Sequence, residues 1–194
     1  MKELLKKVTE GQNLTREEAA KAMDMMLEGT ASPVLVSAFL TALRMKGETV
    51  DEIVGCTEMM KSKGGSVKLD TDEYIDFVGT GGDGANSFNI STTSMFVCAA
   101  AGVTVAKHGN RAASSKSGAS DLLEALGANI MLEPKQVEQC INETGMGFMN
   151  AMKFHKAMKN VGPIRKEIGI RTIFNMLGPL SNPSNASRQV IGVF

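Results

Sequence analysis

The chain contains no tryptophan, one tyrosine, two histidines and three cysteines in 194 residues. The cysteines, Cys56, Cys98 and Cys140, lie far apart and form no Cys-x-x-Cys pair, which argues against a zinc site and against a disulfide framework. We expect all three to be free thiols in a reducing cytoplasm. The formal net charge is zero, which is not typical of a protein that binds nucleic acid or a membrane surface.

Long apolar runs are missing as well. No stretch reaches the roughly 18 uncharged apolar residues that a transmembrane helix needs. Residues 1–7 lack the apolar centre and the small-residue cleavage site of a signal peptide. The composition that remains, 43% hydrophobic and 22% charged, is ordinary for a globular protein and sufficient for a sizeable core.

Acidic residues are absent from one long window. None lies between Asp83 and Asp121, whereas Lys107, Arg111 and Lys116 fall inside it. Residues 134–194 are also more basic than acidic. The resulting positive potential in the second half of the chain would suit an anionic small molecule.

The first 63 residues predict four helices. Thr15-x-x-Glu18 and Thr49-x-x-Glu52 are capping boxes, and Ser32-Pro33 places a good N-cap before a proline at the first helical position. The run 34–45 is apolar nearly all round, so we expect this helix to be buried or to form an interface. Residues 1–70 are therefore predicted to form a helical domain that ends in a charged linker.

After residue 70 the pattern changes to strands that alternate with helices, which favours a mainly parallel α/β domain over residues 71–194. The expected strands are 74–78, 103–106, 128–132, a short one at 147–149, and 188–194; the expected helices are 91–101, 118–126 and 134–143. The last run reads as a buried strand with nothing after it to cover it, so we expect the α/β domain to be incomplete and the chain to be the first part of a longer protein.

The stretch "VGTGGDG", residues 78–84, matches the Gly-x-Gly-x-x-Gly fingerprint of dinucleotide-binding loops. Such a site also needs an acidic residue about 20 positions later, where this chain has Lys107 to Arg111, and the third glycine should open a helix directly. Five residues intervene here, and no Gly-Lys-Ser/Thr follows as a P-loop would require. Both nucleotide interpretations are therefore disfavoured, although Arg111 leaves an NADP variant open.

A phosphate cradle remains. Glycines allow backbone N–H groups to approach an anion, and the helix after Asn89 would point its positive N-terminus at the same place. The turn "KHGNRAASS", residues 107–115, supplies cations, an amide and hydroxyls at the end of the neighbouring strand. Two adjacent strand-to-helix loops would thus meet one anionic ligand at the carboxyl edge of the sheet.

The segments "GTGGDGANSFNIST", "AAAGVTVAKHGNRAASSKSGASDLLEALG" and "GPIRKEIGIRTIFNMLGPLSNP" closely resemble the anthranilate phosphoribosyltransferase family, in the same order and at similar spacing. The resemblance covers essentially the whole chain. It implies a small helical domain, through which the family is typically homodimeric, joined to a larger α/β domain. Part of residues 155–185 would then pack back on the helical domain.

The implied reaction is the second step of tryptophan biosynthesis. The amine of anthranilate displaces pyrophosphate from C1 of phosphoribosyl pyrophosphate, with Mg²⁺ as cofactor. The resemblance assigns phosphoribosyl pyrophosphate binding to Gly79, Gly82, Asp83, Ser87, Asn89, Ile90, Ser91, Thr92, Lys107, His108, Gly109, Asn110, Arg111, Ala112, Ala113, Ser114, Ser115 and Ala119. It assigns anthranilate binding to Gly79, Asn110 and Arg165, a magnesium contact to Ser91, and electrostatic catalytic roles to Lys107, Arg111 and Asp83.

Two departures from the family stand out. Ala119-Ser120 replaces the usual Ser-Ala, so a hydroxyl contact at position 119 is missing or shifted. Family members also continue beyond Phe194 to an Asp-Glu pair that supplies magnesium ligands, and this chain lacks that pair.

Other interpretations stay open. A pyrimidine nucleoside phosphorylase shares the expected architecture but has a different glycine loop. A catalytically silent relative that binds nucleic acid should be strongly basic, and a folded fragment would bind without turnover. His108 could be a hydrogen-bonded loop residue, Asp83 a turn cap, and Arg165 part of a solvated basic helix face.

Overall fold

The computed structural model describes residues 1–81, 87–111 and 117–193. The chain divides into two compact units, each built from two segments of sequence. The helical unit comprises residues 1–64 and 155–181, and the α/β unit comprises residues 65–154 and 182–194. The domain ranges 1–70 and 71–194 remain a prediction. The structure itself divides the chain into the two units just described.

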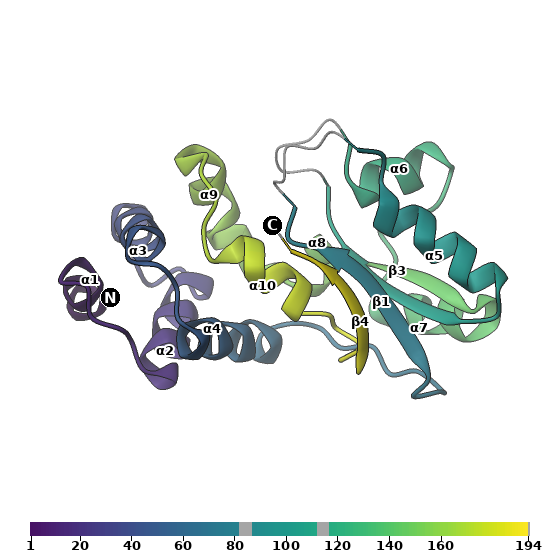
Figure 1. Ribbon diagram of the computed structural model, residues 1–194, viewed down its shortest axis with the longest axis horizontal. Helices are drawn as coiled ribbons and strands as arrows, with labels where there is room; N and C mark the ends of the chain where they lie inside the picture. The colour runs from purple at the N-terminus through teal and green to yellow at the C-terminus, as the bar shows by residue number, and fades with distance from the viewer. Residues whose placement is uncertain (82–86, 112–116, 194) are drawn as a thin grey trace. The chain divides into compact units, whose positions relative to one another are not determined.

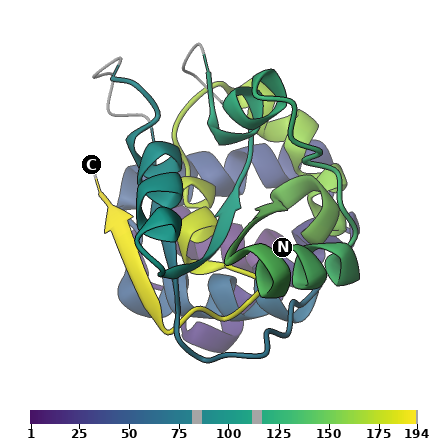
Figure 2. The same cartoon turned by 90° about the vertical axis from the view of Figure 1, so that its right-hand side faces the viewer.

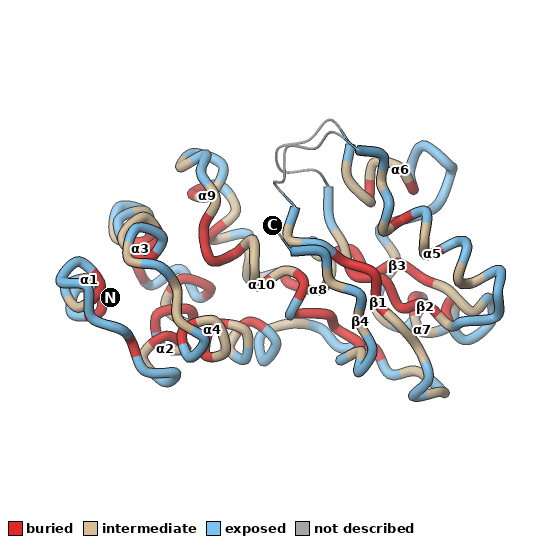
Figure 3. The backbone as a smooth tube through the Cα atoms, viewed as in Figure 1, coloured by how far each residue is buried: buried red, intermediate tan, exposed pale blue. Residues whose placement is uncertain are grey.

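The helical unit contains α1 (Lys2–Thr9), α2 (Arg16–Leu27), α3 (Pro33–Lys46) and α4 (Val50–Ser62), followed later in the chain by the 3-10 helix η1 (Lys156–Asn160), α9 (Gly162–Ile168) and α10 (Phe174–Leu180). Helix α9 packs against α3, α10 packs against α4, and η1 packs against α2. A single core joins the two segments, from Met23, Leu40 and Leu43 to Ile173 and Leu177. Figure 3 shows the buried faces of these helices in red.

The helix starts follow the sequence closely. Thr15 and Thr49 each accept the N–H of the glutamate three residues later, and both capping boxes form as predicted. Ser32 caps α3 through the N–H of Leu35, with Pro33 at the first helical position. The four predicted N-terminal helices are thus confirmed.

In its described residues the α/β unit has four parallel strands, β1 (Tyr74–Gly79), β2 (Thr104–Gly109), β3 (Met146–Asn150) and β4 (Arg188–Gly192), in the order β3-β2-β1-β4. Its helices are α5 (Ile90–Ala100), α6 (Ala119–Ala125), α7 (Pro134–Thr144) and the short α8 (Ala151–Phe154). The predicted combination of a helical bundle and a parallel α/β domain is confirmed. Figures 1 and 2 show two views of this sheet and its helices.

Alternating side chains divide the helices between the two faces of the sheet. Val105 packs with Met95 of α5, whereas the next residue, Ala106, packs with Val137 and Ile141 of α7. Phe148 contacts the cluster under α6. A period of two along the strands therefore places α5 and α6 on one face and α7 on the other.

One expectation needs correction. Residues 128–132 form no strand: of this stretch only Ile130 is buried, beneath α6, and residues 146–150 take the pairing position beside β2. The strand expected at residues 188–194 is present over residues 188–192. Its residues alternate between exposed and half-buried, with Val190 54% exposed, which agrees with the expectation that nothing in this chain covers it.

The strand ladders differ in length near the carboxyl edge. β1 pairs with β4 over five residues and β2 pairs with β3 over five, but β1 and β2 pair only at Tyr74–Thr104 and Ile75–Val105. Beyond these pairs, side chains rather than backbone pairs link the two central strands. None of the helices in the described part of the chain is long and apolar enough to cross a membrane.

Candidate functional site

The loops that follow β1 and β2 are joined where each enters its helix. The Asn89 amide, just before α5, donates to the Ser117 hydroxyl at 3.4 Å and to the Gly118 carbonyl at 3.3 Å. Ser117 and Gly118 directly precede α6. The structure thus brings the ends of the two predicted phosphate-binding loops together.

The Asn89 side chain does not cap helix α5 and donates to the second loop. The Ile90 N–H donates to the Phe88 carbonyl at 2.7 Å. The first turn contains Ile90, Ser91 and Thr92; Ser91 is half-buried and Thr92 is buried. Uncapped N–H groups at a helix start, together with the helix dipole, favour an anion. Ser87 precedes this turn and is exposed.

Two glycines lie where the strands end. A Cβ on Gly109 would come within 2.8 Å of Cε2 of the Phe148 ring, so this position has little room for a side chain. Gly79 is exposed at the end of β1, and Gly81 adopts a φ of +66° that favours glycine.

Lys107 and His108 belong to β2 rather than to an exposed turn. Each is 3% exposed. The Lys107 ammonium donates to the Phe77 carbonyl on β1. Burial lowers the pKa of Lys107, and the nearby Asp76 carboxylate partly offsets this by favouring the charged form.

Asp76 is the residue that sequence reasoning missed. It is fully buried on β1, its Oδ1 accepts the His108 N–H at 3.1 Å, and its Oδ2 accepts the Gln189 amide at 3.2 Å. Burial raises the pKa of this carboxyl, while the Asn182 amide, the charge of Lys107 and the other donors oppose the shift. Its signal was a single acid inside the apolar run "YIDFV".

Arg111 and Asn110 stand at the exposed start of the second loop. The Arg111 guanidinium pairs with Asp121 at 2.9 Å and Glu124 at 2.7 Å, both on α6. The Asn110 carbonyl accepts the Ser120 N–H at 3.3 Å, and its side-chain oxygen accepts the Arg111 N–H.

Position 119 and its neighbour differ in burial. Ala119 is half-buried, whereas Ser120 is fully buried, and its hydroxyl has no hydrogen-bond partner among the described residues. The predicted contacts at Gly82, Asp83, Ala112, Ala113, Ser114 and Ser115 lie outside the described residues.

Arg165 lies on α9 in the helical unit. Its guanidinium stacks over the Phe174 ring at 5.0 Å from the ring centroid. Burial lowers the pKa of Arg165, and no carboxylate of the described residues pairs with it. A half-buried guanidinium of this kind is a candidate partner for a carboxylate ligand.

The described residues offer little to a divalent cation. They contain no group of three or more His, Cys, Asp or Glu side chains able to hold a metal ion. Ser91 supplies one hydroxyl, whereas Mg²⁺ in proteins usually takes carboxylates together with substrate phosphates and water. The residues present therefore do not form a magnesium site by themselves.

The helical bundle, the parallel α/β domain and its two joined loops together define a class of protein. The comparison with known families agrees with this class. Residues 2–64 match the helical bundle domain of the glycosyl transferase family, and residues 71–194 match its a/b domain. The chain belongs to this family.

Within the family, the similar proteins carry one name. The chain is 56% identical over 194 residues to the anthranilate phosphoribosyltransferase of Acetivibrio thermocellus, covering all of this chain and 56% of that protein. The crystal structure of the enzyme of that name from Thermus thermophilus is 46% identical with a TM-score of 0.92, covering 98% of this chain and 58% of that one.

A second solved structure carries ligands. The Saccharomyces cerevisiae anthranilate phosphoribosyltransferase in complex with phosphoribosyl pyrophosphate and Mg is 32% identical with a TM-score of 0.85, covering 93% of this chain and 54% of that one. The chain thus spans a little more than half the length of the relatives it matches.

Proposed function

We propose that this chain carries the phosphoribosyl pyrophosphate site of an anthranilate phosphoribosyltransferase, which transfers the phosphoribosyl group to the anthranilate amine in tryptophan biosynthesis. The observation that carries the proposal is the uncapped start of α5, held beside the second loop by Asn89. A helix start whose N–H groups lack a side-chain cap from the N-cap residue, together with two converging βα loops, suits a diphosphate. The phosphoribosyl pyrophosphate complex of the yeast relative supports the choice of ligand.

In this proposal the phosphate contacts come from residues 79, 82, 83, 87, 89–92, 107–115 and 119. Backbone N–H groups at Ser91 and Thr92 would bind phosphate oxygens, and the Ser91 hydroxyl would reach a phosphate-bound metal. Arg111 would exchange its contacts with Asp121 and Glu124 for a phosphate. Because Lys107 is buried, its charge would act from beneath the loops.

Anthranilate would bind through its carboxylate to Arg165. The guanidinium fork matches a carboxylate, and Phe174 already fixes one face of it. Gly79 and Asn110 complete the proposed contacts. A relative from Saccharomyces cerevisiae has been solved in complex with 4-fluoroanthranilate, which supports this ligand class.

The chemistry is a displacement at C1 of the ribose. The C1–O bond to pyrophosphate breaks as the amine nitrogen forms the new C1–N bond, and the amine loses one proton. Charge accumulates on the departing diphosphate, so fixed donors and cations at α5 and the second loop would stabilise the transition state. Positioning contributes the rest, and no covalent nucleophile is required. Mg²⁺, when bound to the diphosphate, would neutralise part of its charge.

The test follows anthranilate fluorescence after phosphoribosyl pyrophosphate and Mg²⁺ are added to this chain. Loss of fluorescence that requires all three components is the expected result. Arg165→Lys, which keeps the charge and removes the planar fork, should raise the KM for anthranilate about tenfold or more. Lys166→Gln, on the exposed side of the same helix, is the matched control. A folded chain that binds neither substrate would overturn the proposal.

We also propose a homodimer through the helical unit. Val34 and Met45, at the two ends of α3, are 77% and 83% exposed, and large exposed apolar side chains favour an interface. Light scattering on the eluted protein should give twice the mass of one chain. A monomer at micromolar concentration would contradict this.

A further inference from the structure

The carboxyl end of the β1–β2 pair is held by side chains rather than by a strand ladder. Backbone pairing between these strands stops at Ile75–Val105. One residue further along, Asp76 accepts the His108 N–H of β2, and in return Lys107 of β2 donates to the Phe77 carbonyl of β1. Each strand thus offers a charged side chain to the other strand's backbone.

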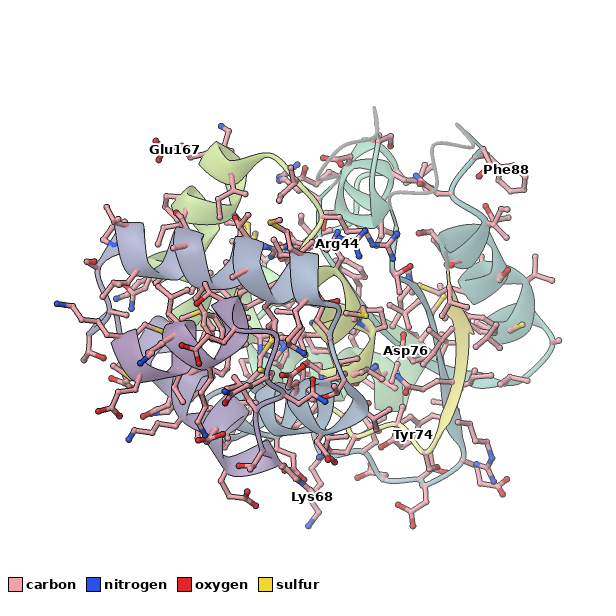
Figure 4. The ribbon with its side chains drawn as sticks, turned by 60° about the vertical axis from the view of Figure 1, so that its left-hand side comes forward. Arg44, Lys68, Tyr74, Asp76, Phe88 and Glu167 are labelled. Carbon is pink, nitrogen blue, oxygen red and sulfur yellow. The ribbon has the colours of Figure 1, made fainter. Side chains whose placement is uncertain are left out.

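Two more side-chain amides bond to the same region. The Ala106 carbonyl on β2 accepts the Asn182 amide at 3.0 Å, and the Gln189 amide on β4 donates to the second oxygen of Asp76. Asp76 therefore connects β2 on one side with β4 on the other. Figure 4 labels Asp76 in the sheet and Phe88 on an outward-pointing side chain before α5.

We propose that Asp76 is a positioning residue, which ties the end of β1 to β2 and keeps Lys107 and the His108–Asn110 backbone in place where the second phosphate-binding loop begins. This inference rests on the proposed function. In the described part of the chain, the Asp76 carboxylate bonds to residues of β2 and β4 and to Asn182. It would therefore act on the ligand through Lys107 and the β2 backbone.

Burial supports this role. Asp76, Lys107 and His108 are each at most 3% exposed, and a buried charge is retained only where a partner of opposite charge or several donors satisfy it. Lys107 on β2 is the charged group that faces Asp76 within the described residues, and β4 presents the neutral Gln189 amide. Loss of the Asp76 charge would leave the Lys107 ammonium buried beside a carbonyl alone.

The experiment compares Asp76→Asn with the wild type and with Glu73→Gln. Glu73 carries the same charge three residues earlier, but its side chain is 84% exposed and pairs with Arg188 at the surface. Hydrogen exchange of residues 104–111, without ligand, should be about tenfold faster in Asp76→Asn and unchanged in Glu73→Gln.

The second measurement is calorimetric binding of phosphoribosyl pyrophosphate. Asp76→Asn should weaken binding about tenfold, and it should add little in a Lys107→Met background, because both changes remove the same charge interaction. Additive losses would mean that Asp76 and Lys107 act independently of each other. Unchanged affinity, additive losses or unchanged exchange would each overturn the inference.

The two proposals fail in distinguishable ways. If the wild type binds no phosphoribosyl pyrophosphate, the proposed function is wrong, and exchange at residues 104–111 alone decides whether Asp76 positions β2. If Asp76→Asn does not fold, Gln189→Leu replaces it, because that change removes one hydrogen bond and keeps the charge. It should weaken binding about threefold, and wild-type affinity would count against the inference.

Discussion

Glu52 in the helical unit and Asp76 in the α/β unit are both fully buried, yet their pKa values move in opposite directions. Burial is the largest influence on each and by itself raises the pKa. At Glu52 the N–H groups of Leu14 and Thr49, at 2.9 and 2.8 Å, and the Lys46 ammonium at 3.0 Å outweigh burial and lower it. At Asp76 burial prevails.

The difference follows from what each carboxylate holds. Glu52 satisfies the start of α4 and the chain just before α2, so all of its partners belong to the rigid frame of the helical bundle. Asp76 satisfies strand ends that lead into loops. The donors around Glu52 outweigh the cost of burying its charge, whereas the donors around Asp76 do not. The protonation of Asp76 is therefore more sensitive to its surroundings, as is typical of carboxyl groups near binding sites.

The largest expected effect tests the frame. Glu52→Ala leaves two backbone N–H groups and the Lys46 ammonium without their buried partner. We expect the free energy of unfolding to fall by about 3–5 kcal/mol, measured by urea denaturation. A loss below about 1 kcal/mol would show that Glu52 and its partners stabilise the fold no more than an exposed ion pair does.

Two glycines sharpen the comparison. A Cβ on Gly55 of α4 would clash with the Arg16 main-chain carbonyl at the start of α2, which cannot move without shifting the helix. A Cβ on Gly109 would instead meet the Phe148 ring, which can turn. Gly55→Ala should cost roughly 3 kcal/mol and Gly109→Ala roughly 1 kcal/mol, both by chemical denaturation. Equal losses would mean that the sheet is as rigid there as the bundle.

The pH dependence of stability should separate the two carboxyl groups with a smaller effect. The pKa of Glu52 is lowered on folding, so its contribution is present above the unfolded pKa and is lost as the pH falls through the folded value. The pKa of Asp76 is raised, so the folded state loses stability as the pH rises from the unfolded value through the folded one.

Urea unfolding from about pH 4 to pH 7 tests these signs. Glu52→Gln should flatten the rise of stability with pH, whereas Asp76→Asn should make it steeper. If both variants changed the slope in the same direction, the contrast between the two carboxyl groups would be wrong.

The smallest effect is expected at the surface. Arg16 and Glu58 form an ion pair between α2 and α4, with half of each side chain exposed. Exposed pairs contribute about 0–1 kcal/mol, so Glu58→Gln should change the unfolding free energy by no more than that. The same variant is the charge-matched control for Glu52→Ala. A loss approaching that of Glu52→Ala would remove the distinction between buried and exposed carboxylates.

Local signals explain which parts of the fold were predictable. The boxes at Thr15 and Thr49 and the Ser32-Pro33 start depend on contacts three residues apart, which a sequence displays directly. Residues 128–132 were wrongly predicted to be a strand, because an apolar run bounded by turn residues is typical of one. Whether such a run joins the sheet depends on long-range pairing, and β2 pairs with residues 146–150 instead.

The candidate site was predictable in outline only. The glycine loops and the Lys107–Arg111 turn stand out in sequence, and the structure brings their ends together through Asn89. The sequence does not show that the Lys107 ammonium is buried and donates to the Phe77 carbonyl, because this depends on how β2 lies beside β1. The hydrogen bonds of Asp76 could not be predicted either, because Gln189 lies 113 residues away in the sequence. The same holds for His155, which contacts the Ser181 carbonyl at 3.1 Å.

The helical unit is discontinuous in the chain, and this has a consequence for synthesis. Residues 1–64 leave the ribosome first, but Val161, Ile164, Ile173 and Leu177 belong to the same core. Most of the sheet must therefore be translated before the bundle can close. Until then the nascent bundle exposes apolar surface, so a chaperone that holds such surfaces would have its longest opportunity between residues 64 and 155.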